Sequence, residues 1–280
     1  SEHPDRDQVW ADAEKARIGD ERFRREHECE FLIFDETLID SIHLADMEPQ
    51  EPIEKTGQVR WYKRPTPGMT YLVSLDPAMG TGGDYAAIQV FELPTFEQVG
   101  EWHHNTTPMN QQVRILQGIN KHIHDTIMEK DSSASPQIFY SMENNSIGEA
   151  ALLRVMDIGE ENIQGMFLSE PIRKGHRRKF RRGFNTTAKH KIDACTKFKE
   201  LVENNKMKIN SQLLISELKD FVASGMSFSA KAGQHDDLVS ASLLMTRMIK
   251  TLADFDPKIF EKWTDRTSEL APMPIYGSFT

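Results

Sequence analysis

The sequence predicts an α/β fold built on a mixed β-sheet. Three short apolar runs, over residues 70–75, 85–93 and 98–103, follow one another closely, so we expect them to pair as an antiparallel meander. A long helical pattern over 108–130 then leads to a fourth strand-like run at 136–142. Strands interrupted by helices in this order are typical of an α/β domain with a mixed sheet.

The remaining elements are shorter or less regular. A charged helical segment is expected over 7–30, and the Pro-, Glu- and Lys-rich stretch 43–68 has the composition of a linker or extended arm. The tail from Asp254 onward has no clear pattern. Further helices are expected over 147–157, 188–204, 212–222 and from Asp236 to about Leu252, and short strands over 166–168 and 207–209.

Composition and length bound the class of protein. The 280 residues are 38% hydrophobic and include 15 Phe and 4 Trp, enough for a buried core. No apolar run reaches 18 residues, so we expect no membrane span, and the first twenty residues are too polar for a secretory signal. The two cysteines, Cys29 and Cys195, form no CxxC or zinc pattern, which fits a reducing cytoplasm.

The distribution of charge is more informative than its sum. A net charge of −9 argues mildly against a nucleic-acid protein. One tract is nevertheless strongly basic and is interrupted by no Asp or Glu. A tract of this kind is either a solvated loop or a contact surface for phosphates, and we favour contact with DNA. Its cations are Arg173, Lys174, Arg177, Arg178, Lys179, Arg181, Arg182, Lys189 and Lys191.

Three acidic residues stand where predicted elements begin or end. Asp76 ends the first strand, Glu143 ends the fourth, and Asp237 begins the last long helix beside Asp236. Each acid alone could be a helix cap or a surface residue. Together, carboxylates that converge without nitrogen or sulfur ligands favour Mg²⁺ or Mn²⁺, and two such ions support phosphodiester hydrolysis.

Two other patterns carry less information. Residues 80–83 are rich in glycine, but the chain contains no GxxxxGK[ST] sequence and the loop leads into a strand, so we expect no nucleotide there. Asp84 could reach the acidic cluster or serve as a turn residue. His103 and His104 alternate across a strand, and His122 and His124 lie on different faces of a helix, so neither pair is expected to share a metal.

Four segments together resemble one known family. YLVSLDPAMGTGGDYAA at 71–87, IFYSMENN at 138–145 and GQHDDLVSA at 233–241 resemble the three catalytic motifs of large terminase nucleases from T-even-like tailed bacteriophages. IGDERFRREHECEFL at 18–32 is similar to the last stretch of the terminase ATPase region. The resemblance covers roughly residues 8–250, and its strength lies in the order of the motifs.

The resemblance implies a fold, an activity and a division of the chain. It implies an RNase H-like fold and a metal-dependent endodeoxyribonuclease that cuts concatemeric double-stranded viral DNA when packaging starts and ends. The metal ligands would be Asp76, Glu143 and Asp237, with Asp84 and Asp236 as helpers, and two Mg²⁺ or Mn²⁺ ions as cofactors. Residues 1–66 would be the end of the ATPase region and a linker, 67–252 the nuclease domain, and 253–280 a C-terminal tail.

The same resemblance implies partners and a location. The partners would be DNA, the ATPase domain of the full protein, the portal protein and the small terminase subunit, in the cytoplasm of the infected host and attached to the procapsid portal. Because the ATPase motifs are absent, we expect no nucleotide binding. Two alternatives stay open: another RNase H-like enzyme of the resolvase or transposase type, and a non-catalytic module that binds DNA or the portal.

Overall fold

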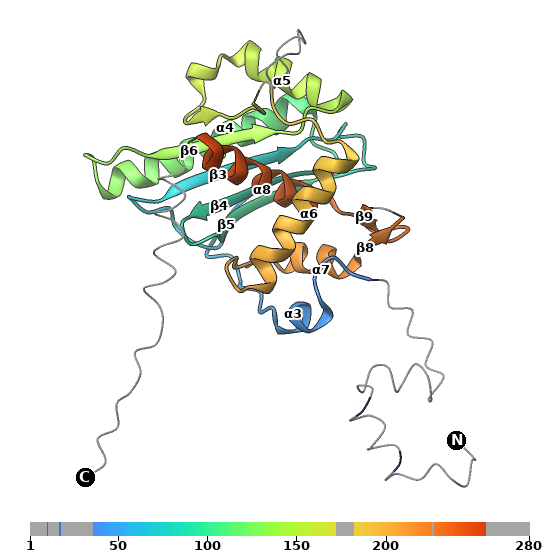
Figure 1. Ribbon diagram of the computed structural model, residues 1–280. Coiled ribbons are helices and arrows are strands. Elements are labelled where there is room, and N and C mark those ends of the chain that lie inside the picture. Colours follow the sequence, from blue (N-terminus) through green and yellow to red (C-terminus); the bar gives the residue numbers. More distant parts are fainter. Residues whose placement is uncertain (1–9, 11–16, 18–35, 172–181, 226, 256–280) are drawn as a thin grey trace, which may run out of the picture. The chain divides into compact units, whose positions relative to one another are not determined.

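A seven-stranded mixed sheet forms the centre of the computed structural model (Figure 1). The structure describes Trp10, Arg17 and residues 36–171, 182–225 and 227–255, and all statements below concern these residues. The strand order is β1-β2-β5-β4-β3-β6-β7. The strands are β1 (Glu54–Thr56), β2 (Val59–Trp61), β3 (Thr70–Asp76), β4 (Ala86–Leu93), β5 (Glu97–His104), β6 (Gln137–Met142) and β7 (Met166–Phe167).

The pairing of the strands confirms the predicted meander. β3, β4 and β5 are antiparallel neighbours, and β6 lies parallel to β3 on its other side. Every residue of β4 is buried, because the strand is central and is covered on both faces. The predicted mixed sheet is therefore correct.

Helices cover both faces of the sheet (Figure 1). Apolar side chains of α4 and α5 pack on one face, and those of α6, α7 and α8 pack on the other. In α4 these residues recur at helical spacing, with Val113, Leu116, Ile119, Ile123 and Ile127 all buried. The helices are α3 (Ser41–Asp46), α4 (Met109–Lys130), α5 (Ser146–Ile158), the 3₁₀ turn η1 (Glu160–Asn162), α6 (Ala188–Glu203), α7 (Gln212–Asp220) and α8 (Asp237–Phe255).

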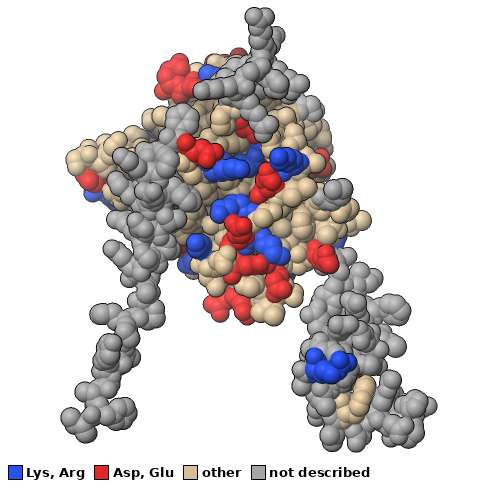
Figure 2. Space-filling model, in the orientation of Figure 1, with Lys and Arg blue, Asp and Glu red and all other residues tan. Residues whose placement is uncertain are grey.

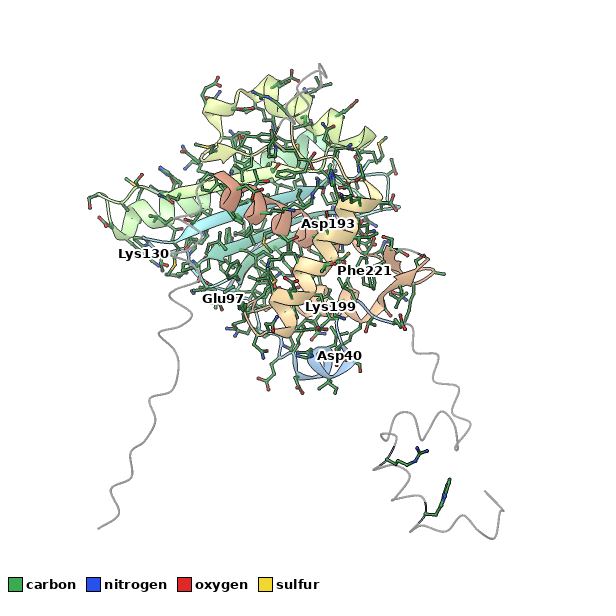
Figure 3. The ribbon with its side chains drawn as sticks, viewed as in Figure 1. Asp40, Glu97, Lys130, Asp193, Lys199 and Phe221 are labelled. Atoms are coloured by element: carbon green, nitrogen blue, oxygen red, sulfur yellow. The ribbon has the colours of Figure 1, made fainter. Side chains whose placement is uncertain are left out.

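The stretch 43–68 is more ordered than its composition indicates. We predicted a linker or extended arm, whereas β1 and β2 lie in it and extend the sheet through antiparallel pairing of β2 with β5. The strands have three residues each, too short to show an alternating pattern. Ahead of them, the backbone amide of Asp40 donates to Glu203, and Lys199 of α6 donates to the Leu38 carbonyl, which ties this segment to α6 (Figure 3).

Other expectations differ from the structure in smaller ways. The strand predicted over 207–209 is a single β-bridge between Lys208 and Glu97. The helix predicted over 212–222 ends at Asp220, and the chain continues as a hairpin that we did not predict, β8 (Phe221–Ser224) and β9 (Ser227–Ala230). The helix predicted over 7–30 lies, except for Trp10 and Arg17, outside the described residues, as does most of the tail after Asp254.

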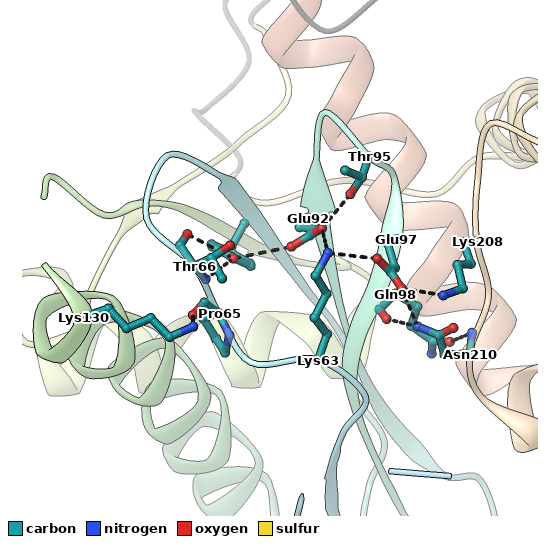
Figure 4. Close-up of polar contacts among 11 residues, drawn as sticks. Lys63, Pro65, Thr66, Glu92, Thr95, Glu97, Gln98, Lys130, Lys208 and Asn210 are labelled. Carbon is teal, nitrogen blue, oxygen red and sulfur yellow. Dashed lines mark hydrogen bonds and ion pairs between the residues drawn. The ribbon is translucent and has the colours of Figure 1, made fainter. Parts of the chain in front are cut away.

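A buried network of charged side chains fixes one end of the sheet (Figure 4). The Glu92 side chain is fully buried and accepts hydrogen bonds from Lys63 and Thr95. Lys63 also donates to Glu97, which in turn pairs with Lys208. A buried carboxylate is tolerated only when it is paired in this way, so the network joins the segment before β3 to the β4–β5 hairpin.

Candidate functional site

Carboxylates meet at the opposite end of the sheet. Because β3 and β6 are parallel neighbours, Asp76 and Glu143 leave the sheet at the same edge, where the Glu143 amide donates to the Leu75 carbonyl at 3.2 Å. The two carboxyl groups lie close enough for the charge of Glu143 to act on Asp76. Both line a cavity of about 160 Å³, together with Lys191 of α6 and Arg247 of α8.

The backbone around Glu143 is held tightly. The amide of Asn144 donates to the Phe184 carbonyl at 2.7 Å, and the amide of Phe184 donates to the Met142 carbonyl at 3.1 Å. Asn145 caps α5 by accepting from the Gly148 amide. A Cβ on Gly148 would lie 1.8 Å from the Glu143 carbonyl oxygen, so only glycine fits there. These contacts set where the Glu143 side chain begins.

Helix α8 brings Asp237 to the same edge. The helix packs across β3 and β4, and the Ser74 hydroxyl donates to the Ala241 carbonyl at 2.7 Å. Asp237 is its first residue. Asp236, just ahead of the helix, lies 3.8 Å from Lys191, and Asp84 is exposed but near enough to act on the charge of Asp237.

The charges of these acids oppose one another. Burial raises the pKa of Asp76 well above its ordinary value, and the neighbouring charges of Glu143, Asp237 and Asp236 raise it further. Burial, followed by the charge of Asp236, raises the pKa of Asp237 to about 6. A group of carboxylates that resists ionisation in this way is stabilised by a bound cation.

Two side chains that the sequence analysis did not select join this cluster. Among the described residues, His103, Glu217 and Asp237 place one potential ligand atom each within 4.8 Å of one another. Asp76 of β3 pairs with Ala87 of β4, and Ala87 pairs with His103 of β5. Asp76 and His103 therefore project from the same face of the sheet, with β4 between their strands. The pairing register of these strands could have placed His103 beside the acids. The sequence analysis considered His103 only as a partner for His104.

Comparison with known proteins identifies the family. The family profile described as "Terminase RNaseH-like domain" matches residues 73–248, more than half of the chain. The chain belongs to this family. The structure is similar to the large terminase nuclease of thermophilic phage G20c, with a TM-score of 0.55, 15% identity, and coverage of 75% of this chain and 96% of that one. The Thermus phage P74-26 large terminase nuclease domain gives a TM-score of 0.51, with 16% identity over 72% of this chain and 91% of that one.

These similarities confirm the predicted RNase H-like fold for this terminase nuclease domain. A second structure of the phage G20c nuclease was solved with bound magnesium, and it gives a TM-score of 0.55 at 16% identity, again covering 75% of this chain and 96% of that one. At this sequence identity the structural matches show the fold alone. The roles of Asp76, Glu143 and Asp237 stay predictions.

The basic tract of this terminase nuclease domain is described only in part. Three of its cations are seen: Arg182 pairs with Glu160, Lys189 is exposed in the first turn of α6, and Lys191 reaches the acidic cavity. On the face that carries α6 and α8, positive and negative groups alternate (Figure 2). The rest of the tract, Arg173, Lys174, Arg177, Arg178, Lys179 and Arg181, lies outside the described residues.

Arg247 is a further cation that the sequence analysis missed. It donates to the Asn185 carbonyl at 3.0 Å and to the Thr186 hydroxyl at 3.1 Å, pairs with Glu170, and lies over the Phe184 ring. It therefore joins α8 to residues 184–186, which lie within the basic tract. Its guanidinium lines the cavity that holds Asp76 and Glu143, and it places a fixed positive charge beside those acids.

The raised pKa of Asp237 predicts a pH-dependent stability. The folded state holds the Asp237 proton more tightly than the unfolded state, so this contribution to stability is full below about pH 4 and is lost as the pH rises through about 6. In EDTA, Asp237→Asn should therefore be more stable than the parent at pH 8, by on the order of 2 kcal/mol, and should lose that advantage near pH 4. Urea unfolding of both proteins at several pH values measures the difference. A difference that does not change with pH would contradict the prediction.

Proposed function

We propose that this chain is a metal-dependent endonuclease that cuts concatemeric double-stranded viral DNA when genome packaging begins and ends. The observation that carries the proposal is the convergence of Asp76, Glu143 and Asp237 at one edge of the sheet, where their charges oppose one another. Family membership supports nuclease chemistry at this edge. As in the sequence analysis, Asp84 and Asp236 are proposed as helpers.

The residues present suit hard divalent cations. Asp76, Glu143 and Asp237 offer carboxylate oxygens, the preferred ligands of Mg²⁺ and Mn²⁺. Oδ2 of Asp237 is buried and makes no hydrogen bond to a described residue, and Nδ1 of His235 lies 3.6 Å away, so this oxygen keeps lone pairs that a cation could bind. We propose that Asp76, Glu143 and Asp237 would hold the ions. When bound, the ions would lower the pKa of an attacking water and stabilise the leaving oxygen.

The protein itself contributes position and charge. The backbone hydrogen bonds on either side of Glu143 and the packing of α8 on β3 fix the three carboxylates before DNA arrives. Lys191 and Arg247 line the same cavity and present positive charge to a DNA phosphate. The products are expected to carry a 5′-phosphate, as the resemblance to terminase nucleases implies.

The test is cleavage of DNA as a function of metal. The purified chain should nick and linearise plasmid in Mg²⁺ or Mn²⁺ and leave it intact in EDTA. A parallel assay on four-way junctions separates this function from a resolvase, which would prefer the junction over linear duplex. Binding of DNA without cutting in any divalent metal would instead indicate a non-catalytic module.

The basic tract is proposed as the contact surface for DNA. Replacing Arg177, Arg178, Arg181 and Arg182 with Ala removes four cations. The slope of log Kd against log salt concentration should therefore fall by up to about 3.6. Arg182 already pairs with Glu160, so its share should be the smallest. Fluorescence anisotropy of labelled DNA, at salt concentrations between about 50 and 200 mM, measures the slope. An unchanged slope would place the DNA path elsewhere.

The wider assignments follow from the same family. We propose that residues 1–66 end an ATPase region and its linker, that 67–252 form the nuclease domain, and that 253–280 form a C-terminal tail. The proposed partners are the ATPase domain, the portal protein and the small terminase subunit, in the cytoplasm of the infected bacterium and at the procapsid portal. Within the described residues, no helix is both long and apolar enough to cross a membrane.

A further inference from the structure

A mixed group of nitrogen and oxygen ligands lies beside the proposed magnesium or manganese site. Nε2 of His103, at the end of β5, lies 3.7 Å from Oε1 of Glu217 on α7. A ligand oxygen of Asp237 completes the group, with all three ligand atoms within 4.8 Å of one another. Around a tetrahedral ion, ligands bound at 2.0–2.2 Å are separated by roughly 3.3–3.6 Å, so small side-chain rotations would bring the three atoms to one ion.

The polar atoms of this group are unsatisfied in the described structure. Nε2 of His103 and Oδ2 of Asp237 are both buried, and neither makes a hydrogen bond to a described residue. The side chains of His103 and Glu217 are only 13% and 10% exposed, so bulk water compensates them poorly. The only charged partner near Oδ2 of Asp237 among the described residues is His235, whose Nδ1 lies 3.6 Å away. Buried polar atoms without a hydrogen bond are costly, so a cation that binds them would stabilise this group.

We propose that His103, Glu217 and Asp237 form a binding site for a late first-row divalent cation, of which zinc and cobalt are the best suited. The imidazole nitrogen distinguishes this site from the carboxylate pair of Asp76 and Glu143, because nitrogen ligands favour zinc and cobalt over magnesium. The proposal goes beyond DNA cleavage, since it concerns which ion the protein holds and where.

The surroundings of His103 prepare its ring for a metal. The ring stacks on Tyr85 with centroids 4.2 Å apart, which holds the imidazole plane in place. A ring whose orientation is fixed in this way loses little freedom when its nitrogen binds an ion.

Glu217 is fixed by a second contact. Its Oε2 accepts a hydrogen bond from the Val239 amide at 3.0 Å, in the first turn of α8. Its Oε1 is the atom that faces His103. The two oxygens therefore serve different partners, one toward the start of α8 and one toward the group of ligands. Through this carboxylate, ion binding would be coupled to the position of the helix that carries Asp237.

The experiment compares two histidines that both stack on an aromatic ring. His103→Phe keeps a ring beside Tyr85 but removes the ligand nitrogen, whereas His122→Phe is the matched control, because His122 stacks on Trp61 on the other face of the sheet. Calorimetric titration of the full chain with ZnCl₂ should show a site that His103→Phe weakens by about 100-fold. His122→Phe should leave it within about twofold of the parent, well under the tenfold change that 1.4 kcal/mol represents.

A second variant separates ligation from helix capping. Glu217→Gln keeps an oxygen for the Val239 amide but cannot ionise to offer a carboxylate to the cation, so it should weaken zinc binding at least about tenfold while the fold is retained by circular dichroism. In nitrogen NMR of the histidine rings, zinc should shift the Nε2 resonance that is missing from His103→Phe. Equal zinc affinity in the parent and His103→Phe would overturn the proposal, as would unchanged affinity in Glu217→Gln.

Both proposed sites use Asp237, but the zinc and cleavage results can be separated because His103 and Glu217 belong to the zinc site alone. A chain that binds zinc through His103 but cuts no DNA in any metal would support the zinc site and contradict the proposed nuclease function. A chain that cuts DNA in Mg²⁺ with no loss of zinc affinity in His103→Phe would support the nuclease and contradict the zinc site.

Discussion

Asp76→Asn should lower the rate of plasmid cleavage by about 1000-fold or more. The change removes a carboxylate that we propose as a metal ligand, and several kcal/mol of transition-state stabilisation would depend on the bound ions. In EDTA the variant should melt at the same temperature as the parent or a few degrees above it, because one charge of a repelling group is lost. Cleavage rate in Mg²⁺ and melting temperature without metal are the two measurements.

The neighbouring acids provide the comparison. Glu143→Gln and Asp237→Asn should lose cleavage to a similar degree, whereas Asp84→Asn and Asp236→Asn should lose less, since we assign them as helpers. Cleavage by Asp76→Asn near the parent rate would contradict the assignment of the site. A fall in its melting temperature in EDTA would instead show that Asp76 stabilises the fold.

Gly148→Ala should damage the site without changing any proposed ligand. The new Cβ would meet the backbone oxygen of Glu143 at 1.8 Å, so the loop that carries Glu143 or the start of α5 must move. A displacement of about 1 Å at a catalytic group costs about 100-fold in rate. The overpacking should also lower the free energy of unfolding by about 1–3 kcal/mol. Plasmid cleavage and urea unfolding measure the two effects.

Gly118→Ala is the matched control in another helix. Gly118 is exposed in α4, and a Cβ there would meet nothing within 4 Å. Alanine should therefore stabilise the helix by up to about 1 kcal/mol and leave cleavage unchanged. If both glycine variants behave alike, the contact between Gly148 and Glu143 has no influence on the site.

Strong local patterns made much of the fold predictable. The apolar run that ends at Asp76 and the helical spacing in α4 each mark one element with a definite face. The order of these elements brought Asp76 and Glu143 to one edge, because parallel neighbouring strands end together. The β8–β9 hairpin escaped prediction because each strand has only four residues, and the sequence FVAS of β8 shows no alternation of polar and apolar residues.

The site was less predictable than the fold. His103 reaches Asp237 only because the register of three strands aligns it with Asp76, and no short sequence motif encodes a register. Glu217 arrives from α7, whose packing depends on the whole core of that face. Lys191 seemed to belong only to a basic tract, whereas the turn of α6 directs it into the acidic cavity. Side chains that depend on tertiary packing leave little trace in the sequence.

The paired charges around Glu92 stabilise one end of the central strands, and the proposed catalytic acids lie at the other end. Glu92 lies opposite Tyr71, five residues before Asp76 on β3, which places the two ends about 16 Å apart at ~3.3 Å per residue. At the end that carries Glu92, Lys63 neutralises the buried carboxylate and the paired charges anchor the sheet. At the end that carries Asp76, like charges oppose one another and weaken the sheet. The acids can therefore diversify in evolution, or be exchanged by design, without unravelling the scaffold that presents them.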